Sequence, residues 1–174
     1  MTGKEFMNKL AHAKDDFLQE FLDILKEAKV PFCVIGGLGV NAYAEPVVSL
    51  DLDVVLALDG VDVIRPKLES RYKVEEFTHS LNVSEKTSDL RIQIQTDSRY
   101  QPFVRRAVKK TVLGYTMPVA LIEDVLQGKI WAASDKTRRQ SKRQKDLADI
   151  ARLVETDAKL APRLPPEIKK QLEF

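Results

Sequence analysis

Residues Pro31 to Leu56 read PFCVIGGLGVNAYAEPVVSLDLDVVL, and this stretch decides the fold. It predicts a short apolar strand, a Gly-Gly turn, a brief helix or loop, and a second apolar strand. Asp51 and Asp53 lie near the start of the second strand. Because a buried charge must be paired or must bind a metal, we expect these two carboxylates to serve a function.

The whole chain has the composition of a soluble globular protein. Its 174 residues are 44% hydrophobic and 31% charged. No apolar run approaches the roughly 20 residues of a membrane span, and no secretory signal is visible, so we expect a cytoplasmic protein with no membrane partner. The single cysteine, Cys33, lies in an apolar strand, which predicts a buried, unreactive thiol.

The charge of the chain is more informative in its distribution than in its total. A net charge of +2 does not indicate nucleic-acid binding by the molecule as a whole. Six cations nevertheless fall within ten residues: Lys136, Arg138, Arg139, Lys142, Arg143 and Lys145. This run is either a solvated loop and helix start, or a surface that guides a triphosphate or an RNA backbone.

Hydrophobic periodicity predicts the other elements. Helices are expected over residues 4–29, 38–44, 61–70, 121–133, 141–155 and 167–172. Strands are expected over residues 32–35, 50–58, 72–77, 81–83 and 88–96, with a hairpin over 109–119 that turns at Gly114. Residues 97–102 are expected to form a polar loop, and the period of residues 103–108 is ambiguous.

These elements predict an α/β (α+β) fold. We expect a mixed twisted sheet with helices on one face, an open front that carries the site, and additional C-terminal helices. Residues 1–119 would form the core with its N-terminal helix. Residues 120–174 would form a helical segment packed on that core, within one compact domain.

The two acidic residues and the two glycines suit the chemistry of phosphate transfer. Asp51 and Asp53 are two residues apart on a strand, so their side chains share one face. Two adjacent carboxylates repel each other unless a cation lies between them, and Mg²⁺ is the usual occupant. Gly36 and Gly37 allow backbone N–H groups to approach phosphate at a helix start. The combination suits phosphoryl or nucleotidyl transfer.

The same residues carry a resemblance to a known family. A Gly-Gly at a strand end, 13 intervening residues and an Asp-x-Asp strand resemble the signature of the polymerase-beta-like nucleotidyltransferase superfamily. The stretch is most similar to the minimal and AbiEii-type toxin nucleotidyltransferases. Their lysine-bearing helix and Lys/Arg-Asp-x-x-Asp helix resemble Lys129 in GKIWAA and Lys145-Asp146-Leu147-Ala148-Asp149 here. The resemblance covers roughly residues 20 to 155.

The resemblance implies transfer of a nucleoside monophosphate from an NTP to an RNA such as tRNA, to a protein or to a small molecule. A toxin role with an antitoxin partner is implied in the same way. The catalytic residues would be Asp51, Asp53, Lys129 and Asp146, with both Asp51 and Asp53 as ligands of Mg²⁺. The residues that bind nucleotide would be Gly36, Gly37, Ser49 and Arg143.

The sequence departs from the family at one position. The family usually adds a third carboxylate on a later strand, and the matching position here is Gln93, which can neither act as a base nor carry the metal's charge. Asp89 is four residues away, roughly 13 Å along a strand, and Asp97 lies just past the strand. The third carboxylate is displaced, supplied by Asp146, or missing. A catalytically weak or inactive protein that binds nucleotide or a partner protein is therefore the alternative.

Each signal also has a purely structural explanation. The two aspartates could form a solvent-facing pair at a strand edge, and the glycines could form a tight turn with close packing. Lys129 could cover a helix surface with its aliphatic stem. Asp146 could pair with Lys142, and Asp149 with Lys145, at i and i+4 spacing on one helix. If all these explanations hold, the chain is a structural or interaction protein.

Overall fold

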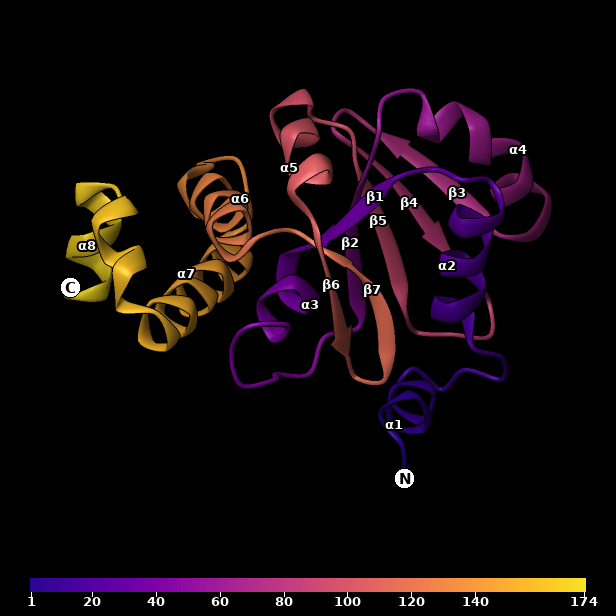
Figure 1. The fold of residues 1–174 in the computed structure, drawn as a ribbon, viewed down its shortest axis with the longest axis horizontal. Helices are drawn as coiled ribbons and strands as arrows, with labels where there is room; N and C mark the ends of the chain where they lie inside the picture. The colour runs from indigo at the N-terminus through magenta and orange to yellow at the C-terminus, as the bar shows by residue number, and fades with distance from the viewer.

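A mixed seven-stranded sheet forms the centre of the computed structural model, which describes residues 1–174 (Figure 1). The strand order is β3-β4-β5-β2-β1-β7-β6. The strands are β1 (Phe32–Ile35), β2 (Asp51–Leu56), β3 (Lys73–Phe77), β4 (Ser80–Ser84), β5 (Arg91–Gln95), β6 (Val108–Val112) and β7 (Tyr115–Val119). The pairs β2–β5 and β1–β7 are parallel and the other neighbours are antiparallel. The predicted mixed sheet and α/β class are confirmed.

Helices α2 (Phe17–Glu27) and α4 (Gly60–Arg71) cover one face of the sheet (Figure 1). The side chains of Leu52, Val54 and Leu56, which alternate along β2, point to this face and are buried. They join one hydrophobic cluster with residues of α2 and α4. Because strand residues alternate between faces, Asp51 and Asp53 point to the opposite face, as predicted.

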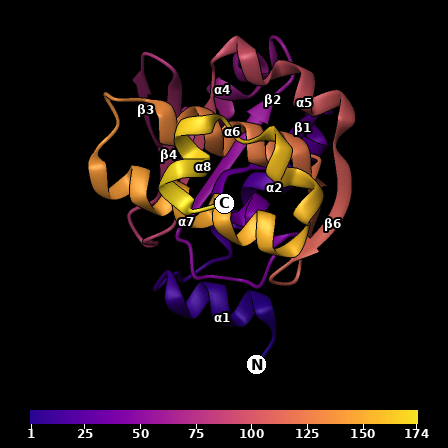
Figure 2. The ribbon, with the colours of Figure 1, turned by 90° about the vertical axis from the view of Figure 1, so that its left-hand side faces the viewer.

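The opposite face is partly covered. Helices α3 (Gly36–Asn41), α5 (Gln101–Arg106) and α6 (Ile122–Ser134) lie against it, and α7 (Gln140–Thr156) and α8 (Pro166–Leu172) pack outside α6 (Figure 2). Cys33 and Val55 lie in a second hydrophobic cluster with residues of α6 and α7. Burial, followed by the nearby charge of Asp124, raises the pKa of Cys33 to about 12, which fits the predicted unreactive thiol. The polar start of β2 remains open for a site.

The prediction of one helix over residues 4–29 is wrong. The chain forms α1 (Gly3–Leu10) and α2, separated by residues 11–16. His12 has a φ of 49°, which interrupts helical geometry. The Asp16 carboxylate then accepts the N–H of Gln19 at 3.1 Å and caps the new helix. The apolar spacing continues across the break, so periodicity alone does not reveal it.

The prediction of a polar loop over residues 97–102 is also wrong in part. A 3-10 turn spans Ser98–Tyr100, and α5 follows it at once. Pro102 lies in the first turn of α5, where its missing N–H costs nothing. Tyr100 and Phe103 are buried beneath this segment, and their packing holds it in a helical form.

The predicted hairpin is confirmed in β6 and β7. Leu113 and Gly114 form its turn with φ values of 51° and 82°. Two successive positive φ values match the twist of a two-residue hairpin. The predicted strands over 50–58 and 88–96 are shorter in the structure, at Asp51–Leu56 and Arg91–Gln95.

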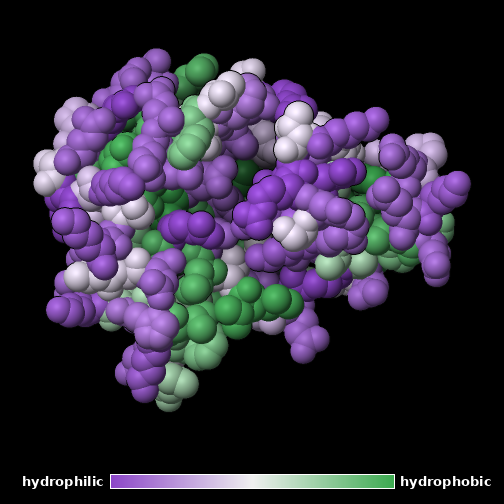
Figure 3. All heavy atoms as spheres, turned by 180° about the vertical axis from the view of Figure 1, so that it is seen from behind, coloured by the Kyte–Doolittle hydropathy of each residue, from purple (hydrophilic) through white to green (hydrophobic).

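The molecular surface is predominantly hydrophilic when seen from behind, with hydrophobic side chains showing between the polar ones (Figure 3). None of the helices has the length and apolar character that crossing a membrane requires. A further short 3-10 helix, Ala158–Arg163, joins α7 to α8.

Candidate active site

Asp51 and Asp53 lie on the same face of β2 but in different surroundings. The Asp51 carboxylate pairs with Arg91, whose Nε lies 3.0 Å from Oδ1, and Lys142 Nζ lies 3.8 Å from Oδ2. Arg91 is its register neighbour on β5. Asp53 instead lines a cavity between the sheet and α6. One carboxylate is therefore held by surface cations, and the other lines the cavity.

Gly36 makes the closest approach to Asp53. It follows β1 directly, has a φ of +66°, and adjoins Ile35, the register partner of Asp53. A Cβ atom at position 36 would lie 2.2 Å from Asp53 Oδ2. Only glycine therefore allows the start of α3 to lie beside this carboxylate.

We expect Gly36→Ala to lower stability by about 2 kcal/mol and to reduce any activity that depends on Asp53, because it adds backbone strain and a clash with the carboxylate. Chemical denaturation measures the first effect. Gly37→Ala is the matched control, since a Cβ there would meet its nearest atom, Ser49 Oγ, at 3.4 Å, an ordinary contact. Equal effects of the two substitutions would contradict this account of Gly36.

Gly37 and Ser49 lie next to each other, outside the walls of the cavity. Ser49 is buried, and its Oγ accepts the N–H of Asp51 at 3.3 Å and donates to the Asp51 carbonyl at 3.2 Å. Ser49 therefore fixes the backbone at the start of β2. Ser49 does not line the cavity itself, and it acts on the site by holding the backbone of Asp51.

Lys129 on α6 is held by two carboxylates of α7. Its Nζ lies 3.0 Å from Asp146 Oδ1 and 2.8 Å from Asp149 Oδ2, and all three residues are buried. Arg138 Nε donates to the other oxygen of Asp146 at 2.7 Å. The alternative pairs of Asp146 with Lys142 and of Asp149 with Lys145 do not form, because both carboxylates face Lys129 on α6 and Asp149 pairs on its own helix with Arg152.

Asp149 extends this network to the loop that follows α3. Arg152 Nη1 donates to Asp149 Oδ1 at 2.8 Å. Arg152 Nη2 donates to Asn41 Oδ1 at 3.0 Å and to the carbonyl of Glu45. Asn41 in turn accepts the N–H of Val47 and donates to its carbonyl. The ion pairs of Lys129 are thus tied to the segment that leads into β2.

Two groups of the site have shifted pKa values. Burial raises the pKa of Asp53 to about 6, because the cost of removing its charge from water exceeds the stabilisation by Lys129. Burial alone would lower the pKa of Lys129, but the charges of Asp149 and Asp146 outweigh that effect and raise it. Lys129 is therefore a permanent cation at neutral pH.

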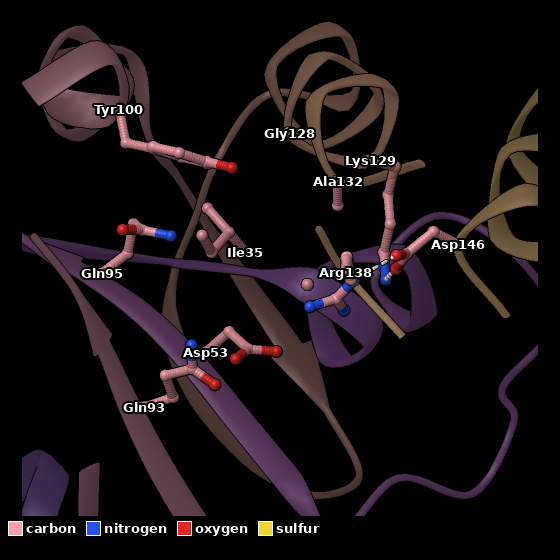
Figure 4. A pocket seen from close by; sticks show the side chains of 11 residues that line it. Ile35, Asp53, Gln93, Gln95, Tyr100, Gly128, Lys129, Ala132, Arg138 and Asp146 are labelled. Atoms are coloured by element: carbon pink, nitrogen blue, oxygen red, sulfur yellow. Dashed lines mark hydrogen bonds and ion pairs between the residues drawn. The ribbon is translucent and has the colours of Figure 1, made fainter. Parts of the chain in front are cut away.

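These side chains meet in a cavity of about 90 Å³, which we call the inner pocket (Figure 4). Asp53 and Gln93 enter it from the sheet, and Lys129, Arg138 and Asp146 enter it from the side of α6 and α7. The remaining lining residues are Ile35, Gly36, Gln95, Tyr100, Gly128 and Ala132. The sheet wall therefore presents the Asp53 carboxylate, and the facing wall presents two cations held by Asp146.

Arg143 is not among the residues that the structure brings together here. Its Nε donates to the carbonyl of Ala133 at 3.0 Å, and the side chain lines a separate groove. Arg138 reaches the inner pocket instead. The run of six cations pointed to this segment, but its spacing alone did not distinguish Arg138 from Arg143.

Asp146 is the only one of the three alternative carboxylates that lines the inner pocket. Asp89 pairs with His12 at 2.6 Å on the surface, and Asp97 pairs with Arg99 at 2.9 Å. Gln93 is the register neighbour of Asp53 and faces it across the two strands. The position expected for a third carboxylate is thus occupied by an amide.

The donors at this site fit a hard divalent cation such as Mg²⁺. Asp51 and Asp53 supply carboxylate oxygens from one strand face, with the amide of Gln93 beside them. A cation between the carboxylates would relieve the cost of burying the charge of Asp53. No group of three or more His, Cys, Asp or Glu side chains is placed to hold a metal, so water and phosphate oxygens would supply the remaining ligands.

Comparison with solved structures identifies the class of fold. The antibiotic-resistance factor ANT(2'')-Ia shares 12% identity over 84% of this chain and 90% of that chain, with a TM-score of 0.58. The lincosamide antibiotic adenylyltransferase LnuA in its lincomycin-bound form shares 14% identity over 81% and 98%, with a TM-score of 0.56. A nucleotidyltransferase-like protein from Paracoccidioides brasiliensis shares 12% identity over 99% and 94%, with a TM-score of 0.53. The chain therefore has the nucleotidyltransferase fold.

The family follows from the sequence. Residues 17–171 match the model of the nucleotidyl transferase AbiEii toxin family, described as belonging to a type IV toxin–antitoxin system. The chain belongs to this family. No curated protein sequence matches it. The predicted resemblance is confirmed.

Proposed function

We propose that this chain transfers a nucleoside monophosphate from an NTP to an acceptor, with Mg²⁺ bound by Asp51 and Asp53. The observation that carries the proposal is the inner pocket, where three distant segments place a carboxylate, a close backbone approach and two cations around one space. These segments are β2, the β1–α3 junction and the α6–α7 pair. Such a site suits a reaction in which positioning and charge neutralisation supply most of the catalysis.

When bound, Mg²⁺ would neutralise phosphate charge and polarise the phosphorus–oxygen bond that breaks. The chain's own residues do the remaining work. Asp53 is mostly ionised at pH 7, since its pKa is about 6. Gly36 lets the start of α3 lie beside the Asp53 carboxylate, and the backbone N–H groups of Gly36 and Gly37 would cradle the phosphates. Lys129 and Arg138 face this space with fixed positive charge, and Asp146 holds both cations in place.

The surface beside the inner pocket favours a polyanionic acceptor. Lys136, Arg138 and Arg143 line a groove at the start of α7, and Arg138 belongs to both spaces. Lys and Arg side chains along a groove bind a nucleic-acid backbone through its phosphates. We therefore favour an RNA acceptor such as tRNA over a protein or a small molecule. The family match supports a toxin role with an antitoxin partner.

The experiment that tests the proposal compares wild type and Asp51→Asn with a labelled NTP, Mg²⁺ and total RNA, protein or small-molecule acceptors. We expect the wild type to label RNA and Asp51→Asn to lose about 100-fold or more of that rate, because a charged ligand of the metal is removed. EDTA should abolish the labelling. Lys67→Met is the matched surface control, since Lys67 pairs with Glu27 on the opposite face. If Asp51→Asn labels RNA as well as wild type does, the assignment is wrong.

Gln93 favours a second candidate function, a catalytically weak protein that binds nucleotide or a partner. An amide beside Asp53 cannot take a proton from an acceptor hydroxyl. Calorimetry separates the two functions, since tight NTP binding that does not require Mg²⁺, with no turnover, supports the second. A gain of transfer activity in Gln93→Asp would support it as well.

A further inference from the structure

A second cavity, of about 400 Å³, opens beside the inner pocket, and we call it the outer pocket. The two cavities share the side chains of Gln95, Tyr100, Ala132 and Arg138. A ligand with phosphates in the inner pocket can therefore extend into the outer pocket without leaving the protein surface. The function proposed above gives this second cavity no role.

The outer pocket contains a preformed flat platform. The guanidinium carbon of Arg99 lies 4.7 Å from the centre of the Trp131 ring. Asp97 accepts Arg99 Nε at 3.0 Å, which fixes the plane of the guanidinium. Beneath it, Trp131 stacks on Phe103 with an angle of 2° between the rings, and the edge of Tyr100 packs against both. The platform is thus assembled in the absence of a ligand.

The chemistry of this platform suits a nucleobase. One face of the Arg99 guanidinium rests on Trp131, and the side chain is 56% exposed, which leaves the other face open. Nucleobases stack well on guanidinium planes and on aromatic rings. The carboxylates of Asp97 and Asp135 also line the cavity, and they can accept hydrogen bonds from ring N–H and amino groups.

The charges of the outer pocket disfavour a phosphate group or a cationic acceptor as its ligand. Asp97 and Asp135 balance Arg99 and Arg138, so no excess of positive charge remains to attract phosphate. Arg99 already covers the face of Trp131, so a cationic acceptor cannot stack there. A flat, uncharged ring with donors at its edge fits the cavity better than either.

We propose that the outer pocket binds a nucleobase, stacked on Arg99, from either the NTP or the terminal nucleotide of an RNA acceptor. This inference deepens the proposed function and rests on it for the identity of the two sources. It assigns Arg99 and Trp131 to a binding subsite, and it connects the polar triphosphate site to an aromatic one.

Trp131 is the single tryptophan of the chain, so its fluorescence reports on this cavity directly. The probes are the four NTPs, inorganic tripolyphosphate as a probe without a base, and a short unpaired oligoribonucleotide. We expect an NTP or the oligoribonucleotide to change the fluorescence of Trp131 far more than tripolyphosphate does. Arg99→Ala should weaken that binding about tenfold, a usual effect of losing one stacking partner. Arg99→Lys should weaken the binding similarly, because lysine keeps the positive charge but lacks the planar guanidinium group on which a base stacks.

Arg65→Ala is the matched control, because Arg65 forms exposed ion pairs with Glu69 and Glu76 on α4 and β3. Thermal unfolding of the Arg99 variants checks that they remain folded. A response to NTPs identifies the substrate as the source of the base, and a response to the oligoribonucleotide alone identifies the acceptor. If neither probe exceeds tripolyphosphate, or if both Arg99 variants bind like wild type, the inference is overturned.

The failure of this inference differs from the failure of the proposed function. Nucleotidyl transfer that is unaffected by Arg99→Lys would remove the subsite and leave the reaction intact. Base binding that depends on Arg99, without any transfer of label, would remove the reaction and leave the subsite intact.

Discussion

Replacing Asp53 with asparagine is expected to stabilise the metal-free protein at pH 7 by about 2 kcal/mol and to lower nucleotidyl transfer by about 100-fold or more. Burial raises the pKa of Asp53 from 3.8 to about 6 in the folded state. The neutral form is therefore favoured in the folded protein, so this group supports stability below pH 4. That contribution is lost as the pH rises through about 6, where the partly buried carboxylate ionises. Asparagine keeps the shape and avoids the charge.

Denaturation in EDTA at pH 7 and at pH 4 measures this effect, and the gain should shrink to about 0.5 kcal/mol at the lower pH. Asp51→Asn is the matched control on the same strand. Because Asp51 pairs with Arg91 and Lys142, its replacement should give no gain in stability. A gain of the same size for Asp53→Asn at both pH values would contradict the burial of charge at this position.

Lys129→Met is expected to lower the free energy of unfolding by about 3 kcal/mol, because two buried carboxylates then share fewer cations. Lys129 is 7% exposed, Asp146 is 1% exposed and Asp149 is 4% exposed, so water cannot replace the lost ammonium. Arg138 and Arg152 remain, which places the loss at the lower end of the range for a broken buried pair.

Urea denaturation measures this loss. Lys142→Met serves as the control, since the Lys142 side chain is 39% exposed and lies 3.8 Å from its partner, and it should change stability by less than about 0.5 kcal/mol. Adding Asp149→Asn to Lys129→Met should restore part of the stability by removing one unpaired charge. If Lys129→Met behaves like Lys142→Met, the ion pairs described for Lys129 are not present in solution.

The sequence predicted the part of the fold that local patterns determine. The order of the elements in residues 31–56 and the hairpin around Gly114 were predicted correctly, because alternation, glycines and turn signals lie within a few residues of each other. The helix nevertheless begins at Gly36 and ends at Asn41, where a Gly-Gly turn followed by a helix over 38–44 was expected. The single N-terminal helix was wrong, because the cap at Asp16 competes with an apolar spacing that continues through it. The α5 helix was missed, because its burial depends on contacts with β1, β2 and α6 that are distant in the sequence.

For the site as well, only the residues that lie close together in the sequence could be predicted. The glycine pair and the two aspartates are close in sequence, and their shared strand face follows from alternation. The partners of Lys129 and the inward position of Arg138 depend on how α6 packs against α7, which spacing does not encode. The platform of Arg99 and Trp131 joins residues 32 positions apart, and no motif marks it.

Position-specific labelling of the NTP tests the central claim most directly. Wild-type protein is incubated with Mg²⁺, total RNA and an NTP that carries its label in either the α-phosphate or the γ-phosphate. We expect RNA to gain the α label and not the γ label, and we expect Asp53→Asn to transfer neither. Transfer of the γ label, or equal transfer of the α label by wild type and Asp53→Asn, would contradict that claim.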